Sequence, residues 1–408
     1  MTRGQRTRAC LPCRTRRMKC DETAPRCLQC LRAGRECPGP ITGPLIVNMT
    51  TDVGHKVRSK ALSASNSPEG KLLPAPDAFP IMAQVFFEHY LSCYASDIGG
   101  SPRKDWMYEI PLMPSMVHNA ALERAVQATG TAFYATHSSQ PGASDAARKI
   151  YGDALQAQTQ MLRSAKPGVP TPHMIYTALM LSYFECLYAT SANGYVGHVE
   201  GAVKMLELAG PEICQSGMMY QLFLNLRTQM LYVSFLTRRP SFFATEVGTT
   251  IARSASEEPS LYDRLIRILT FLVECYNGNM PFPNGSFAHA VIDGLWDEFE
   301  AENMKLGESP SVAGSYRDSY NAHTVSFFEI ARILSLVVVP GDEAGYNVDD
   351  KLKAASASIL ASARYIKAAG RSCAHSRTPF PLKIVTLNSP LKTHRQEAQS
   401  LLESWAHA

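Results

Sequence analysis

The sequence predicts an all-α protein in two parts, a small cysteine-rich module at the amino terminus and a large, mostly helical domain after it. Two observations support this fold class. Six cysteines fall within the first 37 of the 408 residues. Beyond residue 79 the chain carries apolar residues at helical spacing and few strand signals. The expected domains are the module over 1–40, a flexible Pro-, Gly- and Ser-rich linker over 41–78, and a helical domain over 79–408.

The cysteines repeat one C-x2-C-x6-C unit twice, at Cys10, Cys13, Cys20, Cys27, Cys30 and Cys37. A segment this short holds too little apolar surface to fold alone and needs metal or disulfide crosslinks. Two C-x2-C pairs with two further cysteines are typical of zinc ligands. Six sulfurs can complete two four-ligand sites if two of them bridge both ions. The spacing therefore predicts two zinc ions per chain.

The charge of the module indicates a nucleic-acid partner. The first 37 residues hold ten of the 40 basic residues and three of the 36 acidic ones, which leaves 30 basic and 33 acidic residues elsewhere. The whole positive excess therefore lies on the cysteine-rich module. A compact cationic module is typical of proteins that bind nucleic acid.

Residues 10–21, which read CLPCRTRRMKCD, and the later Cys27, Cys30 and Cys37 closely resemble the fungal binuclear zinc cluster (Zn2Cys6) transcription factors. The resemblance covers about 40 residues without a gap. It implies that Cys10 and Cys27 bridge the two zinc ions, that Cys13 and Cys20 complete one site, and that Cys30 and Cys37 complete the other. It further implies two short helices, a nuclear location and double-stranded DNA with CGG-like half-sites as the target.

The basic residues of the module divide by expected role. Arg17 occupies the position where the family usually has a base-reading lysine, and a guanidinium donates well to the N7 and O6 acceptors of guanine. The others are expected to contact phosphates, which positions the module without reading sequence. These are Arg14, Arg16, Lys19, Arg26 and Arg32.

Three alternatives stay open at this point. A secreted disulfide knot is disfavoured because the Arg-rich start contains no signal peptide. The zinc cluster could instead dock a protein, with DNA contacts incidental. The helical domain could be a small-molecule sensor or an enzyme, although the sequence holds no H-E-x-x-H, G-x-S-x-G, G-x-G-x-x-G or phosphate-loop motif. No catalytic residue is therefore predicted.

The linker offers no convincing coiled coil. Leu45, Met49, Val53 and Val57 fall four residues apart, but Gly54 interrupts this short run. Dimerisation is therefore expected through the helical domain, or the protein binds as a monomer.

Apolar spacing predicts the helices in order. Stripes cover 147–162, 261–276 and 352–366, the last opened by Asp349 and Asp350 and closed by Gly370. Residues 174–189 are apolar nearly all round and predict a buried central helix, which Glu185 makes too short for a membrane span. A helix over 218–236 is expected to end before Pro240. The acidic segment 293–302 is interpreted as an amphipathic surface helix rather than an activation segment, and 382–387 is the best candidate strand.

A second, weaker resemblance involves the run from Gly197 to Phe242, which includes GHVEGA at 197–202 and RRPSF at 238–242. It is similar to the helical regulatory region of fungal transcription factors. The glycines are expected at helix ends, and His198 is expected to be partly buried and hydrogen-bonded. The predicted function is a sequence-specific regulator of transcription whose helical domain responds to a partner, a ligand or a second subunit.

Overall fold

The computed structural model describes residues 10, 12–13, 16, 18–21, 23, 26–35, 37, 119–137, 142–164, 170–214, 217–254, 259–282, 285–305, 316–338, 347–370 and 373–406. The chain divides into two compact units, Met1–Glu69 and Gly70–Ala408. Each unit has its own cluster of buried side chains. The predicted linker over 41–78 and the first part of the predicted helical domain, 79–118, lie outside the described residues.

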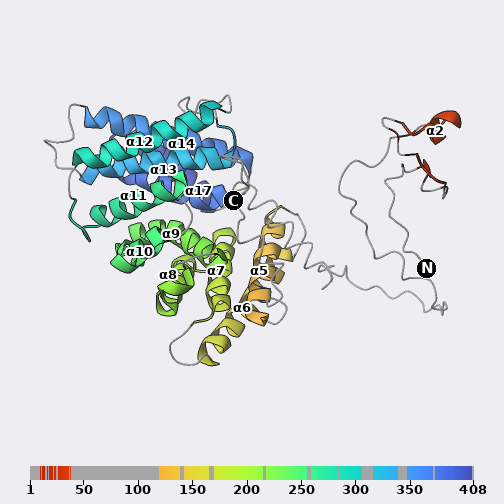
Figure 1. Cartoon of the computed structure of the whole chain (residues 1–408), viewed down its shortest axis with the longest axis horizontal. Helices are drawn as coiled ribbons and strands as arrows, with labels where there is room; N and C mark the ends of the chain where they lie inside the picture. Colours follow the sequence, from red (N-terminus) through yellow and green to blue (C-terminus); the bar gives the residue numbers. More distant parts are fainter. Residues whose placement is uncertain are drawn as a thin grey trace. The chain divides into compact units, whose positions relative to one another are not determined.

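The first unit contains the short helix α2 (Leu28–Arg32). The second unit is built from helices, and its described residues form no strand (Figure 1). The prediction of an all-α fold is thus confirmed. In chain order the helices are α5 (Ala120–His137), α6 (Ala143–Ser164), α7 (Pro172–Leu187), α8 (Gly194–Ala209), α9 (Gly217–Thr237), α10 (Glu246–Ser254), α11 (Leu261–Tyr276), α12 (Gly285–Lys305), α13 (Ser319–Val338), α14 (Val348–Ala369), α15 (Cys373–Arg377), α16 (Pro379–Asn388) and α17 (Lys392–Ala406), with 3-10 turns η6 (Pro211–Cys214) and η7 (Phe242–Ala244).

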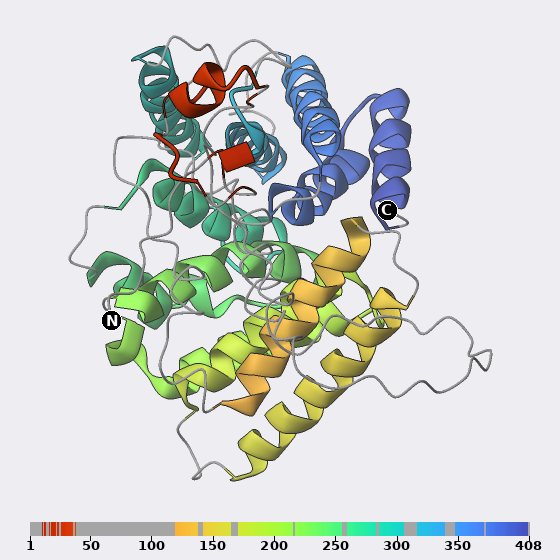
Figure 2. The ribbon, with the colours of Figure 1, turned by 90° about the vertical axis from the view of Figure 1, so that its right-hand side faces the viewer.

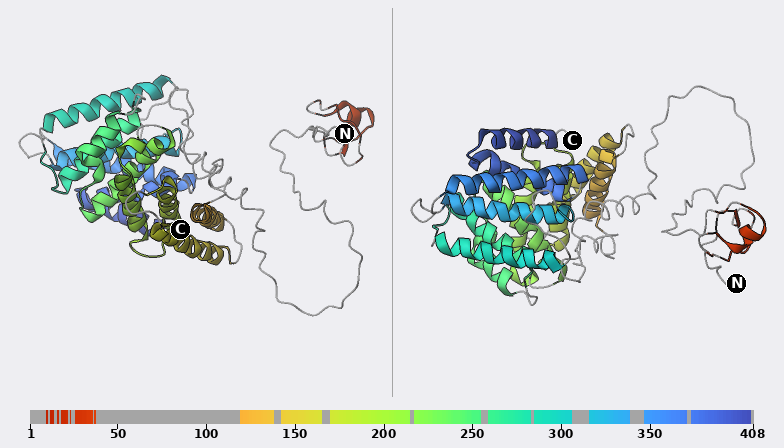
Figure 3. Two further views of the ribbon diagram at one scale, coloured as in Figure 1. Left: turned by 60° about the horizontal axis from the view of Figure 1, so that its bottom comes forward. Right: turned by 90° about the horizontal axis from the view of Figure 1, so that it is seen from above.

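Helices that follow one another in the chain pack in pairs. Helix α5 packs against α6, α7 against α8, α13 against α14, and α16 against α17. Figure 2 shows α5 and α6 side by side, and Figure 3 shows α13 and α14 from two further directions. Helix α11 contacts both α9 and α13 and so connects the earlier pairs with the later ones. One continuous core results, because each helix buries its apolar face against the next.

Helix α7 is the predicted buried central helix. Every residue from Met174 to Glu185 is buried, and α7 contacts α5, α6, α8 and α9. A helix that is apolar all round must be covered on all sides, which explains its central place. Within the described residues, no helix combines the length and the apolar character needed to cross a membrane.

The ends of the predicted helices agree with their capping residues. The Ser260 hydroxyl accepts a hydrogen bond from the Asp263 amide at 3.2 Å and begins α11. Asp349 and Asp350 lie in the first turn of α14, and Gly370 ends that helix with φ of 95°. Helix α9 stops at Thr237, three residues before Pro240.

The strand prediction for 382–387 is wrong, because these residues belong to α16. Pro379 occupies the start of that helix, where its fixed φ and missing amide hydrogen favour helix initiation. Leu382, Ile384 and Val385 are buried. Spacing alone does not distinguish a short, fully buried helix from a buried strand.

The acidic segment 293–302 forms part of α12, as the amphipathic interpretation predicted. Phe299 is fully buried, and the Trp296 ring lies 5.2 Å from that of Phe328 in an edge-to-face contact. These aromatic side chains hold α12 on α13 and are therefore unavailable as an exposed activation motif.

Two glycines provide a matched test of the packing. A Cβ atom at Gly248 would lie 2.4 Å from the Phe242 carbonyl oxygen, whereas a Cβ atom at Gly201 in α8 would meet nothing within 4 Å. Gly248→Ala is expected to lower the free energy of unfolding by about 1–3 kcal/mol, because η7 must move away from α10. Gly201→Ala is expected to raise it by about 0.5–1 kcal/mol. Urea unfolding of both variants, followed by circular dichroism, tests the pair; equal effects would contradict this packing.

Candidate metal centre and nucleic-acid interface

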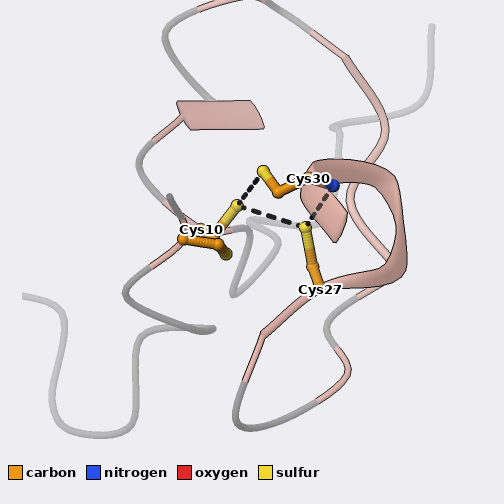
Figure 4. Close-up of side chains that lie close together, drawn as sticks. Cys10, Cys27 and Cys30 are labelled. Atoms are coloured by element: carbon orange, nitrogen blue, oxygen red, sulfur yellow. Dashed lines mark hydrogen bonds between the residues drawn. The ribbon is translucent and has the colours of Figure 1, made fainter. Parts of the chain in front are cut away.

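The six amino-terminal cysteines come together in the first unit. Five of them are buried, Cys20 is half-buried, and all are free thiols. The Cys10 Sγ lies 3.5 Å from the Cys27 Sγ and 3.7 Å from the Cys30 Sγ (Figure 4). The Cys13 Sγ lies 3.7 Å from the Cys27 Sγ. These separations are far longer than a disulfide bond of about 2.05 Å. The six cysteines therefore form no disulfide in this structure, which argues against the secreted disulfide knot.

The sulfurs form two overlapping groups of four. One group holds Cys10, Cys13, Cys20 and Cys27, the other holds Cys10, Cys27, Cys30 and Cys37, and within each group all ligand atoms lie within 4.8 Å of one another. Tetrahedral zinc with Zn–S bonds of about 2.3 Å places its sulfurs about 3.8 Å apart. The measured separations fit that geometry. Cys10 and Cys27 belong to both groups, as the bridging role implied by the resemblance requires.

Local sequence explains how Cys27 and Cys30 are placed. Cys27 is the N-cap residue of α2, and its Sγ accepts a hydrogen bond from the Cys30 amide at 3.3 Å. The Asp21 carboxylate accepts from the Leu28 amide at 3.0 Å and the Gln29 amide at 3.3 Å. Asp21, which follows the first three cysteines, thereby accepts hydrogen bonds from the free amides in the first turn of α2, between the fourth and sixth cysteines. Asp21 lies seven residues before Leu28, so no local sequence signal identifies this role.

Burial makes the thiols of the cluster weak acids. Burial raises the pKa of the Cys10 thiol to about 12 and also raises the pKa values of Cys13 and Cys27. These buried, clustered sulfurs therefore hold their protons at neutral pH unless a cation stabilises the thiolates. A divalent metal reverses this preference because coordination deprotonates the thiol. The donor set thus fits zinc, which prefers thiolate ligands.

The basic residues around the cluster lie at the surface. The side chains of Arg16, Lys19, Arg26 and Arg32 are all exposed. Arg14 and Arg17, the second of which is the predicted base-reading residue, lie outside the described residues. The Met18 amide donates to the Cys13 carbonyl at 3.0 Å, which ties the backbone leading to Lys19 to a buried cysteine. The buried sulfurs therefore support an exposed cationic surface.

In the second unit, His198 is half-buried and hydrogen-bonded, as predicted. Its Nε2 lies 2.8 Å from the Tyr151 hydroxyl, and that hydroxyl donates to Glu185 Oε1 at 2.6 Å. Because the hydroxyl has one hydrogen, His198 Nε2 must donate to it. Burial lowers the pKa of His198, which the nearby Glu185 opposes. The network joins α6, α7 and α8, so its role is structural.

The glycines of this region only partly follow the prediction. Gly210 lies at the C-cap of α8 with φ of 91°. Gly197 and Gly201, expected at helix ends, lie inside α8 instead. Gly194 begins α8, and a Cβ atom there would lie 2.3 Å from the carboxyl carbon of Glu185. A larger side chain would collide with Glu185, so packing explains the glycine at this position.

Family comparisons match both parts of the chain. Residues 8–41 match the fungal Zn(2)-Cys(6) binuclear cluster domain, and residues 85–267 match the fungal specific transcription factor domain. The second match includes the run from Gly197 to Phe242 that carried the weaker resemblance.

Two characterised relatives share parts of the sequence. The transcriptional regulatory protein moc3 of Schizosaccharomyces pombe is 53% identical over 38 residues, which cover 9% of this chain and 8% of that protein. The aspercryptin biosynthesis cluster-specific transcription regulator atnN of Emericella nidulans is 29% identical over 142 residues, which cover 31% of this chain and 22% of that protein. The matched segments thus span less than a quarter of either relative. No solved structure matches the chain.

Proposed function

Since the chain belongs to the fungal binuclear zinc-cluster transcription factors, we propose that it is a nuclear regulator of RNA polymerase II transcription that reads a short CGG-like DNA site with its first unit. The observation that carries this proposal is the pair of four-sulfur groups with two shared cysteines, set beneath exposed basic side chains. A metal-stiffened cationic module of this kind suits a duplex groove better than an enzyme active site.

The six cysteines take separate roles in this proposal. Cys10 and Cys27 would each hold both zinc ions, because each belongs to both groups. Cys13 and Cys20 complete one site, and Cys30 and Cys37 complete the other. The zinc ions supply the crosslinks that the small apolar content of the segment does not, so metal binding and folding are one event.

The basic residues position the module and read the site. Arg17 donates to guanine in the major groove, whereas Arg14, Arg16, Lys19, Arg26 and Arg32 contact phosphates. The name of one relative, a biosynthesis cluster-specific regulator, supports control of a metabolic gene cluster as the biological role. Pairing of two chains through the helical unit would set the spacing of half-sites.

Selection of bound sequences from a random DNA pool with the full-length chain tests this function. We expect enrichment of a CGG-like triplet, in one copy for a monomer or in two at fixed spacing for a dimer. Recovery of a pool with no preferred triplet would contradict sequence-specific recognition and would favour the protein-docking alternative.

Arg17 and Arg26 separate base reading from phosphate contact. Arg17→Ala is expected to cost about 1–3 kcal/mol on the selected site and to relax preference at one base pair. Arg26→Ala is expected to weaken binding equally on all sequences. It is also expected to lower the slope of log affinity against log salt concentration by about one, because one phosphate contact is lost. Gel-shift titrations on cognate and scrambled DNA at several salt concentrations measure both. Equal losses for Arg17→Ala on the two DNAs would refute its role in base reading.

A further inference from the structure

The second unit contains a cavity lined by residues between 227 and 280. Its volume is about 210 Å³, and it lies among residues of α9, η7, α10 and α11. Phe243, Phe271 and Met280 provide apolar walls, and two arginines, Arg227 and Arg267, also line it. Two cationic side chains in a small, largely apolar cavity call for a physical explanation, because a buried charge is costly unless it is paired.

Arg227 is incompletely paired. Its side chain is 3% exposed, and its Nη2 lies 3.7 Å from Asp263 Oδ1 and 3.4 Å from the Asp263 carbonyl oxygen. The Asp263 carboxylate also accepts from the Ser260 hydroxyl at 2.7 Å. Within the described part of the chain, Arg227 Nε is buried without a hydrogen-bond partner. The pairing is long, and it leaves one N–H donor of Arg227 without a partner in this part of the chain.

Arg267 adds a second positive charge. Its Nη2 donates to the neutral Ala252 carbonyl at 2.9 Å, and its Nε is buried with no hydrogen-bond partner among the described residues. Within those residues no carboxylate pairs with Arg267, and the described lining contains no Asp or Glu. Burial lowers the pKa of Arg227, and the nearby Arg267 acts in the same direction while Asp263 opposes it. Asp263 therefore pairs with Arg227, and the positive charge of Arg267 has no carboxylate partner within the described residues.

We propose that this cavity binds a small organic monocarboxylate with an apolar body. The guanidinium fork matches a carboxylate through two parallel hydrogen bonds, and a ligand anion would complete the charge balance of the two arginines. The apolar walls would cover the rest of the ligand. The volume is smaller than the roughly 300–1,000 Å³ of sites for drug-sized ligands, so a single ring or a short acyl chain fits best. This site is independent of the zinc cluster and extends the function beyond DNA binding.

Benzoate and its neutral analogue benzamide are suitable probes for the full-length, zinc-loaded chain. A ligand that binds the folded state raises the unfolding temperature with concentration. We expect benzoate to raise it in a saturable manner and benzamide to have no such effect. Arg267→Gln is expected to reduce benzoate affinity about tenfold or more. Arg264→Gln is the matched control, because Arg264 lies one turn earlier on α11 and pairs with Glu298; its benzoate affinity is expected to stay unchanged.

A second variant keeps the test valid if Arg267→Gln folds poorly. Thr249→Leu on α10 fills part of the cavity without changing its charge and is expected to weaken benzoate binding as well. Equal binding of benzamide, or unchanged benzoate affinity in both Arg267→Gln and Thr249→Leu, would overturn the proposal. Equal protection by inorganic phosphate would also overturn it, since the apolar body would then be dispensable. Binding to the selected DNA, measured on the same preparations, distinguishes a failed cavity proposal from a failed function.

Discussion

Replacing Cys27 with serine is expected to release both zinc ions and to abolish specific DNA binding. Cys27 belongs to both four-sulfur groups, and its Sγ also caps α2 through the Cys30 amide. A serine hydroxyl is a poor ligand for zinc in a thiolate site, so neither ion keeps four ligands. Since metal binding folds the module, DNA affinity is expected to fall at least about 1,000-fold, to the level of non-specific binding.

Elemental analysis and DNA titration of the full-length variants measure this effect. The wild-type chain is expected to carry two zinc ions, and Cys27→Ser fewer than one. Cys37→Ser is a comparison within the cluster, because Cys37 belongs to one group and its loss is expected to spare one ion at reduced affinity. Cys275→Ser, in the second unit, controls for the loss of a thiol. Retention of two zinc ions by Cys27→Ser would contradict the shared-ligand arrangement.

Glu185→Ala is expected to produce the largest loss of stability in the helical unit. Glu185 is 4% exposed, and its carboxylate accepts hydrogen bonds from the Tyr151 hydroxyl and from the Thr190 amide and hydroxyl. Removing it leaves the buried Tyr151 hydroxyl without its carboxylate acceptor and opens a cavity beside α7, whereas the exposed Thr190 can turn its donors to water. The free energy of unfolding is expected to fall by about 3 kcal/mol, because the network connects α6, α7 and α8.

Urea unfolding followed by circular dichroism measures this change. Glu207→Ala is the matched control, because Glu207 pairs with Lys204 at the surface of α8 and its loss is expected to change stability by less than about 0.5 kcal/mol. Zinc content is expected to be unchanged in both variants. Equal stability of Glu185→Ala and Glu207→Ala would show that the network does not support the helical unit.

Much of the fold was predictable because its signals are local. Helix α14 begins with two acids and ends at a glycine, and helix α11 carries a regular apolar stripe after a serine cap. Residues 382–387 were misassigned because a six-residue apolar run is compatible with strand or helix, and packing decides between them. Gly197 and Gly201 were misplaced for a related reason: a glycine inside a helix costs only about 1 kcal/mol, which tertiary contacts readily offset.

The sequence by itself determined the chemical character of the amino-terminal module, because C-x2-C spacing and a local excess of arginine suffice to predict zinc and nucleic acid. It also determined the helical class of the remainder through the spacing of apolar residues. Only the tertiary structure decided which side chains meet across distant helices. Glu185 pairs with Tyr151, which lies 34 positions away in the chain. Arg227 and Arg267, which line one cavity, lie 40 positions apart. Such contacts follow from how whole helices pack, which short-range patterns do not encode.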